Sequence, residues 1–259
     1  QMGRGGDAGT LAVVAEAMVN AGRLDEAERT YEQALQKDPL NRQALLGLGD
    51  LKAGKQQYRA AAGLYESYLK EKPEAGWVWF RLGEVTYEAG GDGKPAHERA
   101  LDLVPLTDEP ATLAMHARVH ARQKEWESAI GLYERALTVG RSDADLACDF
   151  VDVLFSAGRT ERAERLLTVT ANRHPQNTRV WRQQAALMMR RSRYAEAATI
   201  LRKLHRRRPQ DIGVESDLAF AERLSGRWSA AMQHYDSASA RAGYRRRPMP
   251  ASGLEPAMG

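Results

Sequence analysis

Small residues return in this chain at multiples of 34 positions, and this spacing constrains the fold more than any other feature. Around the first of them, residues 11–39 form a predicted helix, a turn at 20–22 and a second helix that ends before Pro39. A fixed period of this length predicts an all-α array of stacked antiparallel helix hairpins, because neighbouring hairpins must bury each other's apolar faces. The residues that carry the period are Ala27, Ala61, Ala129, Ala163, Ala197 and Ala231.

The third repeat departs from this period. Its first helix has Gly83 at the expected place, but the position of the small residue in its second helix is taken by Pro95. If Ala100 is matched to the end of the repeat instead, the second helix has lost two residues and begins near Lys94. Three glycines precede it, and glycine is a poor helix former, so we expect the segment 90–110 to be the least stable part of the array.

The positions of Leu48, Gly49, Ala61, Tyr65 and Pro73 in the second repeat resemble the signature of the tetratricopeptide repeat. The resemblance extends over seven repeats and nearly the whole chain. It implies a right-handed α-solenoid, that is, a superhelix of stacked hairpins whose first helices line a concave groove.

Three regions follow from this division. The glycine-rich residues 1–7 are expected to be disordered, and residues 8–243 form the repeat array, with its third repeat degenerate near 90–110. Residues 244–259 are basic and then rich in Pro and Gly, so we expect a tail or linker.

The formal net charge of +4 is unevenly distributed along the chain. Between Arg173 and Arg247, sixteen arginines and Lys203 are set against six acidic residues, a net charge of +11. Since the whole chain carries +4, the rest carries −7. The asymmetry has two interpretations: a surface that attracts an acidic partner, such as an anionic polymer, or an ordinary solvated surface.

Neither a membrane span nor a cellular compartment is indicated by the sequence. No apolar run approaches the roughly 18 residues that suggest a transmembrane helix. The single cysteine, Cys148, allows no internal disulfide, which leaves both periplasm and cytoplasm open.

The residue types that catalysis and metal binding need do not converge in the sequence. His116 and His120 are one helical turn apart, but no third metal ligand follows, and in the repeat register both are expected to face inward. Cys148 has acidic neighbours, which disfavour a reactive thiolate. With no phosphate-binding loop or nucleophile motif either, we expect no catalytic activity, no cofactor and no metal site.

The resemblance places the binding surface on the first helices. Transferred by register, the positions that line the family's groove carry aromatic residues and alternating acidic and basic bands. We expect the three aromatic residues among them, Trp77, Phe80 and Tyr87, to be exposed on one stripe. Large exposed aromatic residues on one face usually mark an interface. The expected partner-binding residues are Trp77, Phe80, Glu84, Tyr87, Arg118, Arg122, Asp145, Asp152, Arg179 and Arg182.

Three functions remain open. The leading hypothesis is a non-enzymatic scaffold that binds a protein partner, as a peptide or a helix, in its groove within a larger assembly. A second is the periplasmic repeat region of a bacterial exopolysaccharide or pilus secretion protein, in contact with polymer or synthase components. A third, which the scattered distribution of the arginines disfavours, is nucleic-acid binding through the basic C-terminal third.

Overall fold

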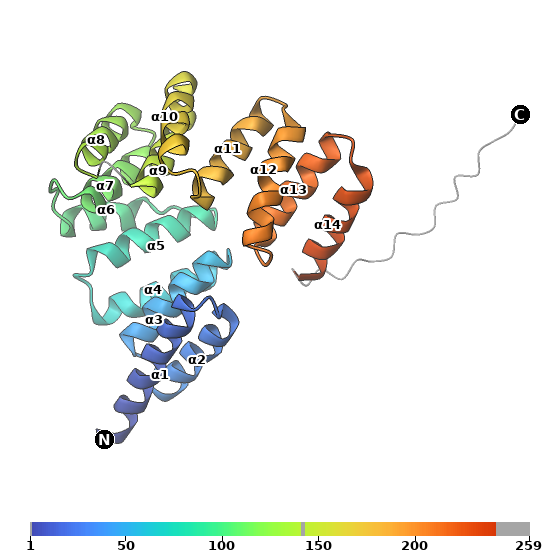
Figure 1. Ribbon diagram of the computed structural model, residues 1–259. Helices are drawn as coiled ribbons and strands as arrows, with labels where there is room; N and C mark the ends of the chain where they lie inside the picture. The colour runs from blue at the N-terminus through green and yellow to red at the C-terminus, as the bar shows by residue number, and fades with distance from the viewer. Residues whose placement is uncertain (1, 141–142, 242–259) are drawn as a thin grey trace, which may run out of the picture. The chain divides into compact units, whose positions relative to one another are not determined.

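The computed structural model describes residues 2–140 and 143–241, and every regular element in these ranges is an α-helix. The helices form seven consecutive hairpins (Figure 1). The first helices are α1 (Met2–Asn20), α3 (Arg42–Gly54), α5 (Gly76–Glu88), α7 (Pro110–Arg122), α9 (Ala144–Ser156), α11 (Thr178–Arg190) and α13 (Ile212–Leu224). The second helices are α2 (Leu24–Lys37), α4 (Tyr58–Glu71), α6 (Lys94–Leu103), α8 (Trp126–Val139), α10 (Thr160–Arg173), α12 (Tyr194–Arg207) and α14 (Trp228–Arg241).

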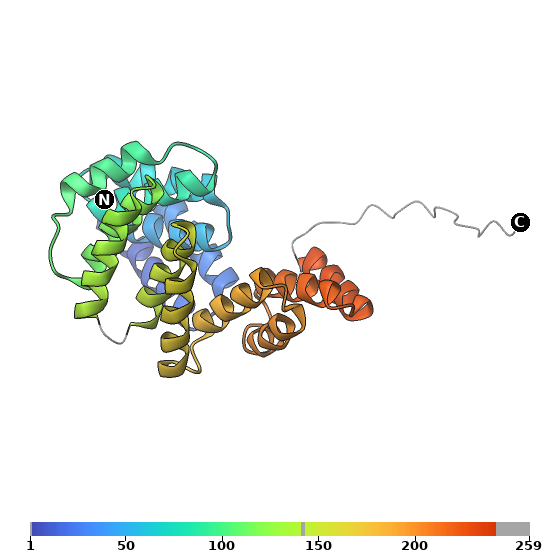
Figure 2. The same cartoon turned by 90° about the horizontal axis from the view of Figure 1, so that it is seen from above.

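The chain divides into two compact units, Gln1–Val139 (unit 1) and Gly140–Gly259 (unit 2). Within each unit the two helices of a hairpin pack against each other, as α13 and α14 do in both views (Figure 1, Figure 2). First helices of successive hairpins also touch, since α1 packs on α3 and α9 packs on α11. The all-α hairpin array expected from the 34-residue period is confirmed.

The turn inside each hairpin has one residue in the left-handed backbone region, and these seven residues are spaced by 34. Four are glycines, which adopt this conformation without steric cost, whereas three carry side chains. Because Gly90 keeps the spacing, the third hairpin is still in register at its turn, and its deletion lies further along the chain. The seven residues are Gly22, Gln56, Gly90, Lys124, Gly158, Ser192 and Gly226.

Side-chain caps at the start of the first helices follow the same period. Asn41, Asp143, Asn177 and Asp211 each accept hydrogen bonds from backbone N–H groups in the first turn of the following helix. Such a cap stabilises a helix by about 1 kcal/mol. At the corresponding places before α5 and α7, no side-chain cap is formed, so the helices around the third hairpin begin with less support.

The core is built from the small residues of the period and the aromatic residues beside them. The six periodic alanines are buried, as are Tyr31, Tyr65 and Tyr133 of the second helices. Gly49 makes room for one of them, because a Cβ at this position would lie only 2.5 Å from Cε1 of Tyr65. Small residues on a first helix thus let an aromatic residue of the second helix pack against its backbone.

The third hairpin contains the shortened helix that the sequence predicts. Helix α6 begins at Lys94, has 10 residues where α4 has 14, and carries Pro95 in its first turn, where proline is tolerated. The segment is nevertheless packed, since Ala96, His97 and Ala100 are buried. The boundary between the two units lies after Val139, not within 90–110. That 90–110 is the least stable segment stays a prediction.

Residues 2–7, for which the sequence predicts disorder, are helical in the structure, because α1 begins at Met2. Ala8 is fully buried and Asp7 forms an ion pair with Lys37 of α2, so the helix is anchored where disorder was expected to end. Residue 1 and the expected tail 244–259 lie outside the described residues. None of the described helices combines the length and the apolar character needed to cross a bilayer.

Candidate binding surface

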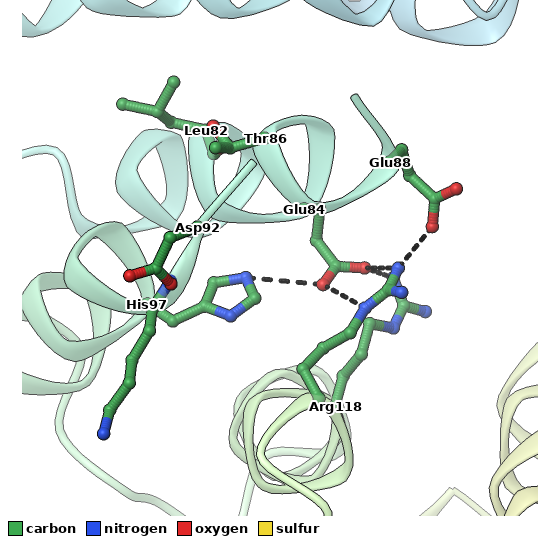
Figure 3. Close-up of polar contacts among 9 residues, drawn as sticks. Leu82, Glu84, Thr86, Glu88, Asp92, His97 and Arg118 are labelled. Atoms are coloured by element: carbon green, nitrogen blue, oxygen red, sulfur yellow. Dashed lines mark hydrogen bonds and ion pairs between the residues drawn. The ribbon is translucent and has the colours of Figure 1, made fainter. Parts of the chain in front are cut away.

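Helix α5 presents two different faces. Leu82 and Thr86 project from one side, and Glu84 projects from the other side toward His97 and Arg118 (Figure 3). The carboxylate of Glu84 accepts hydrogen bonds from Nε and Nη2 of Arg122 at 3.1 and 3.2 Å. Nη1 of Arg118 lies 3.9 Å from the same carboxylate. Glu84 on α5 is therefore paired with two arginines of the next first helix, α7.

His97 of the second helix α6 also contacts Glu84. His97 on α6 is fully buried, and its Nε2 lies 3.3 Å from Oε1 of Glu84. Its ring stacks on Phe80, with centroids 5.6 Å apart, and lies 5.3 Å from the ring of Tyr87. The aromatic residues of α5 thus hold the imidazole that faces Glu84.

These contacts keep Glu84 ionised. Burial of its side chain, which is 17% exposed, would raise the pKa of Glu84. The contact with His97, the hydrogen bonds from Arg122 and the charge of Arg118 outweigh that effect, and the pKa of Glu84 lies below its ordinary value. Burial by contrast raises the pKa of the Cys148 thiol to about 12, so this cysteine stays protonated and unreactive at neutral pH.

An arginine over an aromatic ring recurs between first helices in both units. In unit 1 the guanidinium carbon of Arg122 lies 5.8 Å from the ring centroid of Tyr87, and in unit 2 that of Arg190 lies 4.5 Å from the centroid of Phe155. The two pairs are separated by two repeats in the sequence. Such cation–π contacts contribute about 0.5–1 kcal/mol each at exposed sites.

We call Trp77, Glu84, Tyr87, Glu88, Arg118 and Arg122 the α5–α7 surface.

Charged residues of unit 2 are also paired between successive first helices. Arg179 on α11 pairs with Asp149 of α9 and donates a hydrogen bond to the backbone oxygen of Asp145 at 3.1 Å. Arg182 lies 3.7 Å from Asp217 of α13. The alternating bands expected from the sequence therefore neutralise each other in part. Asp152 is exposed.

The expectation that three aromatic residues form one exposed stripe is wrong for Phe80. Its side chain is only 8% exposed and belongs to a core cluster with Val104, Met115 and Val119 of the neighbouring elements. Ala12 and Cys148, at the same repeat position, are buried as well, so this position faces the adjoining hairpin. Trp77 is exposed as expected, with 43% of its surface accessible, and Tyr87 is half-buried.

The histidines singled out by their spacing have structural roles. His116 is buried, and its Nε2 donates to the backbone oxygen of Val104 at 2.9 Å. His120 lies nearer the surface than expected, and its Nδ1 is 2.6 Å from Oε2 of Glu125. The structure does not bring these two rings together with a third ligand among the described residues.

Comparison with protein families matches the tetratricopeptide repeat over residues 15–75 and again over residues 120–187. The chain belongs to the tetratricopeptide repeat family. The first match begins within α1 and runs through α4, and the second covers parts of both units. No curated protein sequence matches the chain.

Solved structures with the same repeat fold are similar over most of the chain. A tetratricopeptide repeat protein from Parabacteroides merdae has 15% sequence identity and a TM-score of 0.59, covering 91% of this chain and 93% of that one. The Cut9–Hcn1 hetero-tetramer of the APC/C has 16% identity and a TM-score of 0.58, covering 83% of this chain. This chain spans only 42% of that one. At these identities the likeness shows the fold alone.

His97 is absent from the residues predicted from the sequence, although the repeat register contains the signal for it. In the second tetratricopeptide repeat, Oη of Tyr65 donates to Oδ1 of Asp50 at 2.7 Å. Glu84 lies one repeat after Asp50, and the two-residue deletion brings His97 to the place of Tyr65. A buried second-helix residue that faces a first-helix carboxylate is thus shared by both repeats.

Proposed function

We propose that this chain is a non-enzymatic scaffold that binds a protein partner on the α5–α7 surface, as part of a larger assembly. The observation that carries the proposal is the exposure of Trp77 beside a fixed array of charges. Phe80 and Tyr87 of α5 pack against His97 and Trp79 packs on two core clusters, whereas Trp77 is 43% exposed and belongs to none of these clusters. Partly exposed tryptophan and arginine side chains are the residues that most often dominate binding energy at protein interfaces.

The ion pairs support this role by fixing the charges in place. Arg122 is held by both Glu84 and Glu88, with Nη2 donating to Oε1 of Glu88 at 2.7 Å. A partner that meets prearranged charges loses less side-chain entropy on binding than one that must order them. The partner that fits this surface is a peptide or helix with an apolar side chain for Trp77 and an acidic group for Arg118.

The basic character of unit 2 adds a weaker expectation. Some of the arginines of unit 2 have structural contacts. The guanidinium carbon of Arg207 lies 4.7 Å from the ring centroid of Trp181, and its Nη2 donates to Oε1 of Gln176. Arg182 and Arg190 are exposed on α11. An acidic extension of the partner would therefore prefer unit 2, with an affinity that falls as salt rises.

The test is to select peptide ligands from a random library against the full chain and to measure their affinity for two variants. Trp77→Ala removes the exposed aromatic residue of α5, and Val139→Ala removes an exposed apolar side chain of the second helix α8. We expect Trp77→Ala to weaken binding about thirtyfold, the loss of a hot spot of about 2 kcal/mol. Equal effects of the two substitutions, or none, would count against the proposal.

A further inference from the structure

Helices α12, α13 and α14 bring two buried carboxylates and two half-buried histidines together. Glu215 and Glu222 lie two turns apart on α13 and are 1% and 2% exposed. The ring of His234 on α14 stands between them, with Nδ1 3.6 Å from Oε1 of Glu215 and Nε2 3.7 Å from Oε2 of Glu222. His205 on α12 lies edge-on to this ring, with centroids 5.4 Å apart.

A bound cation would stabilise the two buried carboxylates of this group. Two buried carboxylates are costly unless they are paired and hydrogen-bonded. Nε of Arg202 donates to Oε1 of Glu222 at 2.9 Å, but Oε2 of Glu222 and Nδ1 of His205 are buried without a hydrogen-bond partner in the described chain. The distances from His234 to the carboxylates exceed those of hydrogen bonds.

The donor atoms are already close to the arrangement that a transition metal needs. One ligand atom each from His205, Glu215 and His234 lie within 4.8 Å of one another. Four ligands around zinc at about 2.0–2.2 Å are separated by about 3.4 Å, so small side-chain rotations suffice to close the site. Two imidazoles with a carboxylate are ligands typical of Zn²⁺.

We propose that His205, Glu215 and His234 bind a divalent transition metal, with Zn²⁺ the best match to these donors and a water molecule as the fourth ligand. His234 binds through Nδ1, the nitrogen that faces Glu215. Its Nε2–H then donates to Glu222, which Arg202 holds in place. A ligating histidine commonly has a carboxylate on its second nitrogen, because that contact fixes the ring and makes it a better ligand.

The metal would join the last three helices that the structure describes. Glu215 lies in the first turn of α13 and His205 in the last turn of α12, so the turn between the helices brings them together. His234 adds α14, whose core contacts rest on small residues such as Ala231 and Ala238. These three residues could not be recognised as a metal site from the sequence, because they share no short motif and meet only in the folded chain.

The experiment uses the full chain without a histidine tag, stripped of metal with a chelator and titrated with Zn²⁺. Calorimetry gives the stoichiometry and affinity, and the melting temperature is followed in parallel. We expect one Zn²⁺ per chain and a rise in melting temperature of about 5–10 °C at a concentration 100-fold above Kd. Co²⁺ should give the visible absorption of a tetrahedral site.

Variants separate this site from adventitious binding. His205→Gln, His234→Gln and Glu215→Gln should each weaken binding by about 100-fold or more, and Glu222→Gln by about tenfold. The control His174→Gln changes a histidine of unit 2 outside the group and should bind like the unchanged chain. Circular dichroism identifies a variant that fails to fold. If the ligand variants do not fold, the tenfold weaker Zn²⁺ binding expected for Glu222→Gln tests the proposal instead. Absence of a melting shift, or equal Zn²⁺ binding by the ligand variants and the control, would overturn the proposal.

Discussion

The imidazole of His97 occupies the space that a side chain on Gly83 would need. A Cβ at Gly83 would overlap Cδ2 and Nε2 of the ring, which packs against Phe80 and Tyr87. The absence of a side chain at Gly83 therefore allows His97 to approach α5 and reach Glu84. The same relationship holds between Gly49 and Tyr65 one repeat earlier.

Gly83→Ala should destabilise the chain by about 1–3 kcal/mol, the usual cost of overpacking a filled core. The matched control is Gly63→Ala on α4, where an added Cβ meets no atom within 4 Å. There the better helix propensity of alanine should stabilise by about 0.5–1 kcal/mol. Urea unfolding measures both free energies, and stability changes of the same sign for the two substitutions would show that His97 does not pack tightly on Gly83.

Replacing Glu84 by Gln should lower stability in a pH-dependent way. The pKa of Glu84 is lowered in the folded chain, so its stabilising contribution is complete above the unfolded value of about 4.3 and is lost as pH falls through the folded pKa. At pH 7 we expect a loss of about 1–3 kcal/mol. Glu88→Gln, which removes a more exposed partner of Arg122, should cost about 1 kcal/mol or less.

The pH dependence distinguishes charge from packing. Unfolding curves of the unchanged chain and of Glu84→Gln should converge when the pH is lowered below the folded pKa of Glu84, since both side chains are then neutral. A stability difference that persists unchanged into that acidic range would show that shape, rather than ionisation, makes Glu84 important.

The turn residues offer a test of the 34-residue register itself. Lys124 has a φ of 62°, in the left-handed region where a side chain costs about 1 kcal/mol. Lys124→Gly should therefore stabilise the chain by about 0.5–1 kcal/mol, after allowance for the greater freedom of glycine when unfolded. Gly22→Ala, at the same repeat position with a φ of 75°, should destabilise by about 1 kcal/mol. Thermal unfolding of both variants checks these opposite signs.

Phe80 and Trp77 lie close together on α5 but should respond differently to truncation. Phe80→Ala removes a ring from a core cluster and should cost about 3–5 kcal/mol. Trp77→Ala removes an exposed ring whose edge-on contact with Phe80 is worth about 1 kcal/mol. A stability loss from Trp77→Ala as large as that from Phe80→Ala would identify Trp77 as a core residue instead.

The 34-residue period predicts the helices well because it depends on local spacing. Small residues, turn residues and caps recur at fixed intervals, and even the two-residue deletion before Ala100 is visible from Gly83 and Pro95. Each of these signals acts within one hairpin or between two neighbours.

The candidate surfaces were harder to predict because they depend on contacts between hairpins. Whether Phe80 is exposed depends on α6 and α7, and Arg118 pairs with Glu84, 34 residues away in the sequence. The group formed by His205, Glu215 and His234 likewise exists only where three helices meet. The repeat position of a residue predicts which face of the helix its side chain occupies. Contacts with neighbouring hairpins then determine whether that side chain is buried, paired or exposed.

Photo-crosslinking locates a bound peptide on the chain and so tests partner binding on the first helices. A photoreactive amino acid is placed at position 88, where Glu88 is exposed on α5, or at position 139, where Val139 is exposed on the second helix α8. Both positions belong to unit 1, but position 88 lies on a first helix and position 139 on a second helix. With a peptide selected against the unchanged chain, we expect strong crosslinking from position 88 and little from position 139. The reverse pattern would contradict partner binding on the first helices.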